Sequence, residues 1–254
     1  MAALASEPQS IGRVLDSGFK LFVKAFTSVL PLSLAAAAVL AVPNIANVVM
    51  GAPEQPGSPL PSSTFLVLFL VALPIYMILI AAVVYRLGAV AGTHESSAGQ
   101  ALRRGVRCAL SLIGAAILYF LAMAGGLILL IIPGIILSLS LSFAFIAIVL
   151  DGESVLGALK RSHRLVWGNW WRTMAVVSVP VVIVMILYLG LGIVFGASLA
   201  MSDGRPSRDV LITANLIEAA ISGITAPLIY SIMIAQYHDL ILRKEGHDLA
   251  ARLA

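Results

Sequence analysis

A line of polar side chains interrupts an apolar run near the C-terminal end of this sequence. Asn215, Glu218, Ser222 and Thr225 follow at spacings of three, four and three residues, which places them on one face of a helix. An ionisable group inside an apolar helix is costly unless it faces protein or water, so it is a functional candidate. Glu218 is therefore the first residue to consider for binding or transport.

Two asparagines of the first apolar run extend this prediction. Asn44 and Asn47 lie at a depth comparable with that of Glu218. One interpretation is an outward-facing polar cavity lined by all six residues, as a transporter or channel would need. The other is hydrogen bonding between helices, with Glu218 protonated or bonded to an asparagine. The sequence leaves both open.

A second group of residues combines positive charge with tryptophan. Tryptophan before an apolar run is typical of a membrane boundary, where its N–H reaches water. Lys and Arg beside membrane helices attract anionic headgroups, and this fits better than stacking on nucleic acid. We expect lipid-headgroup contact from Arg103, Arg104, Arg107, Lys160, Arg161, Arg164, Trp167, Trp170 and Trp171.

The sequence contains no recognisable motif for metal binding, phosphate binding or nucleophilic catalysis. The four histidines form no His-x-x-x-His pair, and the one cysteine, Cys108, reads as a small buried apolar residue. No phosphate-binding loop and no nucleophile turn occurs. We expect no metal, no cofactor and no enzymatic activity.

The composition predicts an all-α integral membrane protein. The chain is 60% hydrophobic and 11% charged, with a mean hydropathy of +1.03, which is too apolar for a soluble fold of this length. Runs long enough, or nearly so, for a transmembrane helix lie at about 26–49, 64–85, 109–131, 134–150, 173–200 and 209–237. Together they form a single membrane domain, 1–254.

The hairpin of the third and fourth runs has two possible placements in the membrane. Only Pro133-Gly134 punctuates it, and no polar loop marks its tip. A re-entrant or shallow hairpin is the alternative to a full crossing.

Charge fixes the expected orientation. Fourteen of the sixteen Lys and Arg lie in the N-terminal arm, the second and fourth connections and the C-terminal tail. The positive-inside rule then places both termini in the cytoplasm. The opposite first connection, Met50–Ser63, is rich in Pro, Gly and Ser, so we expect an irregular loop.

The three basic segments share a register that predicts an internal repeat. Ser10, Ser97 and Ser154 align as helix N-caps, and each segment can form an amphipathic helix. We expect three units, each an interfacial helix followed by a transmembrane hairpin, related by a pseudo-threefold axis. The other aligned positions are Val14, Ala101 and Ala158, then Gly18, Gly105 and Ser162, then Lys20, Arg107 and Arg164.

A small-residue face marks the fifth run. Gly192, Gly196 and Ala200 follow at spacings of four, a pattern typical of close helix contact in membranes. The sequence does not say whether that contact is internal or between protomers; internal packing is favoured.

Several short motifs resemble a known family. They are Ile132-Pro-Gly-Ile135, Asp151-Gly-Glu-Ser154, Ala158-Leu-Lys-Arg-Ser162, Trp167-Gly-Asn-Trp-Trp171, Tyr237-His-Asp-Leu240 and Lys244-Glu-Gly-His-Asp248. The chain resembles the six-span bacterial inner-membrane family typified by YciC, and the membrane domain fused to some glycerophosphodiester phosphodiesterases. The resemblance implies a multi-span fold in the bacterial inner membrane. It implies no activity, because no soluble phosphodiesterase domain is present.

Three functions remain as hypotheses. The first is a non-enzymatic membrane protein that contacts anionic lipids, in envelope or lipid homeostasis. The second is a transporter or channel that uses the stripe around Glu218. The third is an anchor or scaffold for a cytoplasmic partner. Membrane lipids are the expected partners; nucleic acid is not, and a homo-oligomer stays open.

Overall fold

The computed structural model describes residues 4–50, 62–92, 96–129, 131–201 and 207–253. Within these ranges the chain forms helices and no strands, which confirms the all-α prediction. The predicted irregular loop after Met50 falls almost wholly outside the described residues. The elements are α1 (Ile11–Met50), α2 (Ser63–Ala91), α3 (Ala98–Leu129), α4 (Ile131–Leu141), α5 (Ala144–Ile146), the π-helix η1 (Ala147–Asp151), α6 (Val155–Val166), α7 (Trp170–Met201) and α8 (Arg208–Leu253).

Six helical segments of the described chain are long and apolar enough to cross a membrane, in agreement with the six predicted runs. The prediction of three separate interfacial helices was wrong for the first two. Those segments are continuous with the apolar parts of α1 and α3, because no glycine with a positive φ interrupts either helix as Gly168 does after α6. Only α6 stands as a separate amphipathic helix, ended at Trp167 and the positive φ of Gly168.

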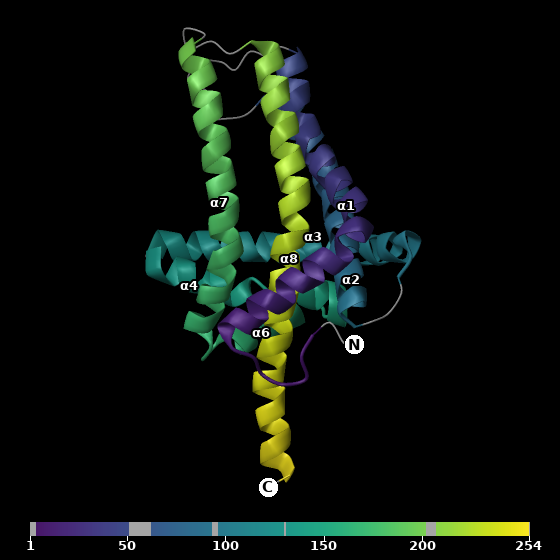
Figure 1. Cartoon of the computed structure of the whole chain (residues 1–254), viewed down its shortest axis with the longest axis vertical. Coiled ribbons are helices and arrows are strands. Elements are labelled where there is room, and N and C mark those ends of the chain that lie inside the picture. The colour runs from purple at the N-terminus through teal and green to yellow at the C-terminus, as the bar shows by residue number, and fades with distance from the viewer. Residues whose placement is uncertain (1–3, 51–61, 93–95, 130, 202–206, 254) are drawn as a thin grey trace.

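The helices fall into two directions (Figure 1). Most of α1 rises beside α8, with α2 packed against α1, and α7 runs alongside them. The first part of α1 runs obliquely below the rest of that helix. Pro31 lies inside α1 and lacks the N–H that would continue the backbone ladder, which is a usual cause of a helix bend. By contrast, α3 lies across α7 and α8, and α4 returns along it.

The main apolar core lies where η1 and α6 meet α2, α3 and α8. Phe143, Ile146 and Leu240 are among its fully buried side chains. A π-helix leaves backbone carbonyls without their usual α-helical partners. Arg104 satisfies two of them, since its Nε donates to the Val149 oxygen at 2.8 Å and its Nη2 to that of Ile148 at 3.3 Å.

The aligned positions of the three basic segments occupy equivalent places. Helices begin directly after Ser10, Ser97 and Ser154. The Ser97 hydroxyl accepts from the N–H of Gln100, and the Gln100 side chain accepts from the N–H of Ser97, which confirms the predicted capping box. The aligned apolar positions are all buried and the aligned basic positions are all exposed. The local register was thus predicted correctly.

The third aligned position is a close contact in each copy. A Cβ on Gly18 would come within 2.7 Å of the Ile232 Cα on α8, and one on Gly105 within 2.3 Å of the Ile78 oxygen on α2. The buried Ser162 hydroxyl donates to the Ser140 oxygen on α4 at 2.7 Å. Each basic segment therefore packs on the second apolar helix of another unit. The start of α1 packs on α8, the start of α3 packs on α2, and α6 packs on α4.

The small-residue face of α7 does not pack internally. A Cβ added to Gly192 or Gly196 would meet no atom within 4 Å. Only 11% of the most apolar part of α7 is buried, the lowest value among the six long apolar helices described. The prediction of internal packing was wrong at these two glycines, because both face open space in the part of the chain that the structure describes.

Candidate functional site

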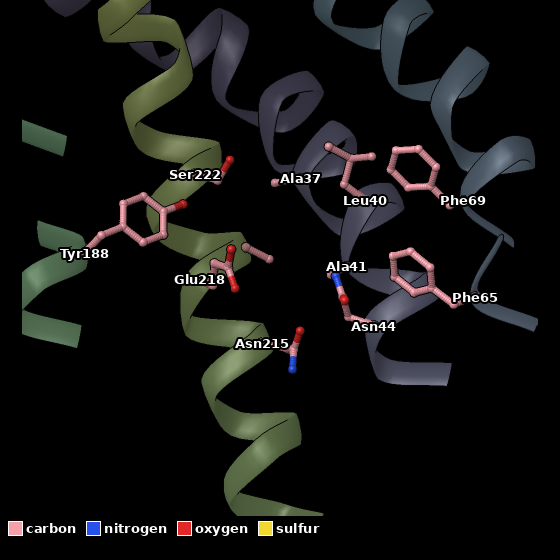
Figure 2. A pocket seen from close by; sticks show the side chains of 11 residues that line it. Ala37, Leu40, Ala41, Asn44, Phe65, Phe69, Tyr188, Asn215, Glu218 and Ser222 are labelled. Atoms are coloured by element: carbon pink, nitrogen blue, oxygen red, sulfur yellow. The ribbon is translucent and has the colours of Figure 1, made fainter. Parts of the chain in front are cut away.

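A cavity of about 210 Å³ surrounds one end of the predicted polar stripe. Figure 2 shows Glu218, Asn215 and Ser222 along α8, facing Asn44 and Ala41 across the space from α1. Two other elements complete the wall, α2 with two phenylalanines and α7 with one tyrosine. The lining consists of Ala37, Leu40, Ala41, Asn44, Phe65, Phe69, Tyr188, Asn215, Glu218, Ala219 and Ser222. We call this space the Glu218 cavity.

Glu218 lies exposed at the cavity and ten residues into α8, ~15 Å from Arg208 at the helical rise. Within the described residues no hydrogen bond or ion pair reaches its carboxylate. The Tyr188 hydroxyl is close enough to interact with Ser222 and with the Glu218 charge. Asn215 donates to the Leu211 oxygen of its own helix at 2.9 Å, so part of its amide is used locally. The carboxylate is thus the strongest acceptor available to an occupant.

Two residues predicted for this cavity lie outside its lining. Asn47 accepts a hydrogen bond at 2.7 Å from the hydroxyl of Ser62, the N-cap of α2, and so ties the start of α2 to α1. Thr225 is buried, and its hydroxyl donates to the Ile221 oxygen at 2.8 Å. Both side chains serve helix contacts, which corrects the prediction for these positions.

The aromatic wall was missed by sequence reasoning. Phe65 and Phe69 lie one turn apart on α2 and stack with ring centroids 5.9 Å apart. Their four-residue spacing is visible in the sequence, but nothing local says which helix their rings face. Tyr188 is a hydroxyl-bearing side chain in the middle of a long apolar helix, a signal that could have been noticed.

The predicted lipid-contact residues divide into two sets. Arg104 caps η1 as described above, Arg161 forms ion pairs with Asp151 (3.4 Å) and Glu153 (3.3 Å), and Trp170 packs against the core. These three side chains act within the protein. The other predicted side chains are exposed, and lipid contact by them stays a prediction: Arg103, Arg107, Lys160, Arg164, Trp167 and Trp171.

A buried ionic cluster closes the end of the molecule where the N-terminal segment meets α7 and α8. The Asp239 carboxylate, 3% exposed, pairs with Arg172 at 2.9 Å and with Arg243 at 2.8 Å. It also accepts the Gln9 N–H at 2.6 Å, and both arginines donate to the Gln9 oxygen. Sequence reasoning missed this cluster because Gln9, Arg172 and Asp239 are far apart along the chain.

The part of the chain that the structure describes holds no group of three His, Cys, Asp or Glu side chains placed for a metal. Cys108 is buried, as predicted, and its thiol donates to the Ile148 oxygen at 3.8 Å.

The fold and its cavities define a class: an all-helical protein with long apolar helices and polar groups enclosed between them. The chain belongs to the family described as Domain of unknown function (DUF7847), whose model matches residues 22–240. The match does not name the YciC-like family, so that resemblance stays a prediction. No solved structure matches the chain.

Proposed function

We propose that this chain is a multi-pass protein of the bacterial inner membrane whose Glu218 cavity binds and carries a small organic cation. Six long apolar helices support the membrane location, and the resemblance to bacterial inner-membrane proteins supports this particular membrane. The concentration of Lys and Arg in alternate connections supports an orientation with both termini in the cytoplasm. In that orientation the Glu218 cavity lies in the outer half of the bilayer.

One observation carries this proposal: Asn44, Asn215 and Ser222 line the same cavity as the Glu218 carboxylate. A carboxylate facing lipid without a partner would be unfavourable. The cavity instead brings polar side chains beside it and leaves room for water or a cation. Purely structural hydrogen bonding fits less well, because within the described residues no bond is formed to this carboxylate.

The aromatic wall narrows the class of cation. Phe65, Phe69 and Tyr188 line the same cavity as Glu218. Quaternary ammonium groups are recognised by aromatic faces, whose quadrupole attracts positive charge. A carboxylate with aromatic neighbours therefore favours an organic ammonium ion over a hydrated metal ion.

The test is uptake of radiolabelled tetraethylammonium into proteoliposomes. Glu218→Gln keeps the side-chain shape and removes the charge. Loss of a charged contact of about 1.5–3 kcal/mol corresponds to a fall of roughly ten-fold or more in uptake at low substrate concentration.

Asp209→Asn is the matched control, because it removes an exposed carboxylate from the start of the same helix outside the cavity. Its uptake should equal that of the wild type. Equal uptake by Glu218→Gln, or no uptake by the wild type, contradicts the proposal.

A second candidate function is contact with anionic lipid at the cytoplasmic face. It is supported by the exposure of Arg103, Arg107, Lys160 and Arg164, together with that of Trp167. Clustered basic side chains at a membrane surface attract anionic headgroups, at about 1 kcal/mol per residue. This role is compatible with transport, and it would fit a part in envelope or lipid homeostasis.

The same membrane setting supports a three-unit architecture. The equivalent close contacts of Gly18, Gly105 and Ser162 are what a pseudo-threefold arrangement of repeats requires. In this arrangement the α3–α4 hairpin is the exception, because it lies across α7 and α8 (Figure 1). We infer that this hairpin lies within the cytoplasmic leaflet and does not cross the bilayer.

A further inference from the structure

A second cavity lies at the other end of α8 from Glu218. Its volume of about 630 Å³ compares with about 210 Å³ for the Glu218 cavity, and it falls within the range of small-molecule sites. The N-terminal segment, the end of α2, the end of η1 and α8 form its walls. The lining consists of Leu4, Ala5, Ser6, Gly88, Ala91, Gly92, Leu150, Asp151, Ile234, Tyr237, His238, Ile241 and Leu242. We call it the Asp151 cavity.

The walls of this cavity are mostly apolar, with polar groups gathered at Asp151. The Asp151 carboxylate accepts from the Tyr237 hydroxyl at 2.5 Å and pairs with Arg161 at 3.4 Å. Arg161 is shared with a second carboxylate, that of Glu153, at 3.3 Å. Among the described residues that line the space, Asp151 is the only carboxylate and none is a lysine or arginine.

The N-terminal segment forms one wall and is held by polar contacts on either side. The His238 Nε2 lies 2.9 Å from the Ala5 oxygen, which accepts the hydrogen bond. Four residues on, the Gln9 N–H donates to Asp239 at 2.6 Å. These two bonds fix the segment to α8, where it forms one wall of the cavity.

The combination of apolar walls and one carboxylate defines the ligand chemistry. An apolar cavity of this size loses contact energy unless an apolar group fills it. Because Arg161 is shared between the Asp151 and Glu153 carboxylates, their pair of negative charges would attract a cationic head and repel an anionic one. We propose that the Asp151 cavity binds a single-chain amphiphile, with its protonated amine at Asp151 and its aliphatic chain against Leu150, Ile234 and Ile241.

Binding at this site is independent of the proposed role of Glu218. The two cavities share no lining residue. Tyr237 and His238 follow Glu218 on α8 by nineteen and twenty residues, or ~30 Å along the helix axis. A ligand bound in one cavity therefore does not block binding in the other.

The test is native mass spectrometry of the full-length protein with dodecylamine as the probe. The test is made in Glu218→Gln, which lacks the charge of the other proposed ammonium site, and each further variant is added to it. Glu218→Gln should bind one dodecylamine per chain, and dodecanoate, with the same chain and an anionic head, should bind at least ten-fold more weakly. Asp151→Asn keeps an acceptor for Tyr237 but removes the charge, so dodecylamine binding should fall at least ten-fold. Ala91→Phe fills the cavity without changing its charge and should weaken binding to the same degree.

Controls assign the site and guard against misfolding. Asp16→Asn removes an exposed carboxylate outside the cavity lining and should leave this binding unchanged. Each variant must elute as the wild type does in size-exclusion chromatography before it is compared. Three results would each overturn the proposal: no dodecylamine binding by Glu218→Gln, no loss of binding on adding Asp151→Asn or Ala91→Phe, or dodecanoate binding equal to that of dodecylamine.

Discussion

The Tyr237 hydroxyl donates a hydrogen bond to the Asp151 carboxylate across 86 positions of sequence, at 2.5 Å. This bond joins α8 to the end of the π-helix η1. It also joins two of the short motifs on which the family resemblance rests, Asp151-Gly-Glu-Ser154 and Tyr237-His-Asp-Leu240. Short motifs that lie far apart in the sequence thus meet at one place, beside the cavity proposed to hold an amphiphile.

Tyr237→Phe tests the structural weight of that bond. The substitution removes the donor from a carboxylate that then relies on Arg161 alone, and Tyr237 is itself 3% exposed. We expect a loss of about 1–3 kcal/mol in the free energy of unfolding, measured as a lower unfolding temperature in detergent. Tyr85→Phe is the matched control, since no hydrogen bond of the Tyr85 side chain occurs among the described residues. Equal melting of the two variants contradicts the prediction.

Gly105→Ala tests the contact between α3 and α2. The new Cβ would lie 2.3 Å from the Ile78 backbone oxygen, so the helices must separate. Such overpacking costs about 1–3 kcal/mol. In Gly99→Ala, on the same helix, the nearest atom is 3.9 Å away, and helix propensity favours alanine by about 1 kcal/mol. Thermal unfolding should therefore move in opposite directions, and a shift of the same sign in both would argue against this packing.

The features that depend on neighbouring residues could be predicted from this sequence, whereas those that depend on how distant helices pack could not. The serine N-caps, the amphipathic faces and the polar stripe of α8 depend on neighbours within one or two turns, so the sequence contains them. Phe65, Phe69 and Tyr188 reach the Glu218 cavity only because α2 and α7 lie where they do. The direction of the α3–α4 hairpin was also beyond the sequence, because a charge count is the same whether or not its tip crosses the membrane.

Asp239→Asn tests the buried ionic cluster. Its carboxylate is the shared partner of Arg172 and Arg243, and removing the charge leaves both guanidinium groups without an anion at that place. Breaking a buried pair costs about 3–5 kcal/mol. Asp16→Asn breaks an exposed pair with Lys20 and should cost less than about 1 kcal/mol. The comparison is made by thermal unfolding, and a loss of similar size in both variants would refute the assigned role of the cluster.

Charge reversal at exposed basic positions tests the contact with anionic lipid. Arg103, Arg107, Lys160 and Arg164 are exposed, so changing them to Glu should leave the fold intact. Arg104 and Arg161 are unsuitable because both act inside the protein. Each lost charge weakens attraction to an anionic surface by about 1 kcal/mol. Native mass spectrometry with phosphatidylglycerol should show fewer bound lipids for the fourfold variant, and no change would reject the lipid-contact function.

The position of the α3–α4 hairpin can be tested through its tip. The Ile132 side chain is 71% exposed, so other parts of the protein do not cover it. The sequence from Leu129 to Ile136 contains no polar side chain. A tip that crossed to the outer surface would meet water. In a Cys108→Ala background, Ile132→Cys should resist a membrane-impermeant maleimide applied from outside intact cells, because lipid covers it.

Two further positions calibrate the labelling. Asp209→Cys, exposed at the start of α8, should react from outside, and Lys160→Cys, exposed on α6, should react only after the membrane is opened. Ile132→Cys should stay unreactive in both conditions, since hydrocarbon and not protein surrounds it. Labelling of Ile132→Cys from outside at the rate of Asp209→Cys would show that the hairpin crosses the bilayer. Labelling at the rate of Lys160→Cys after opening would place the tip in the cytoplasm.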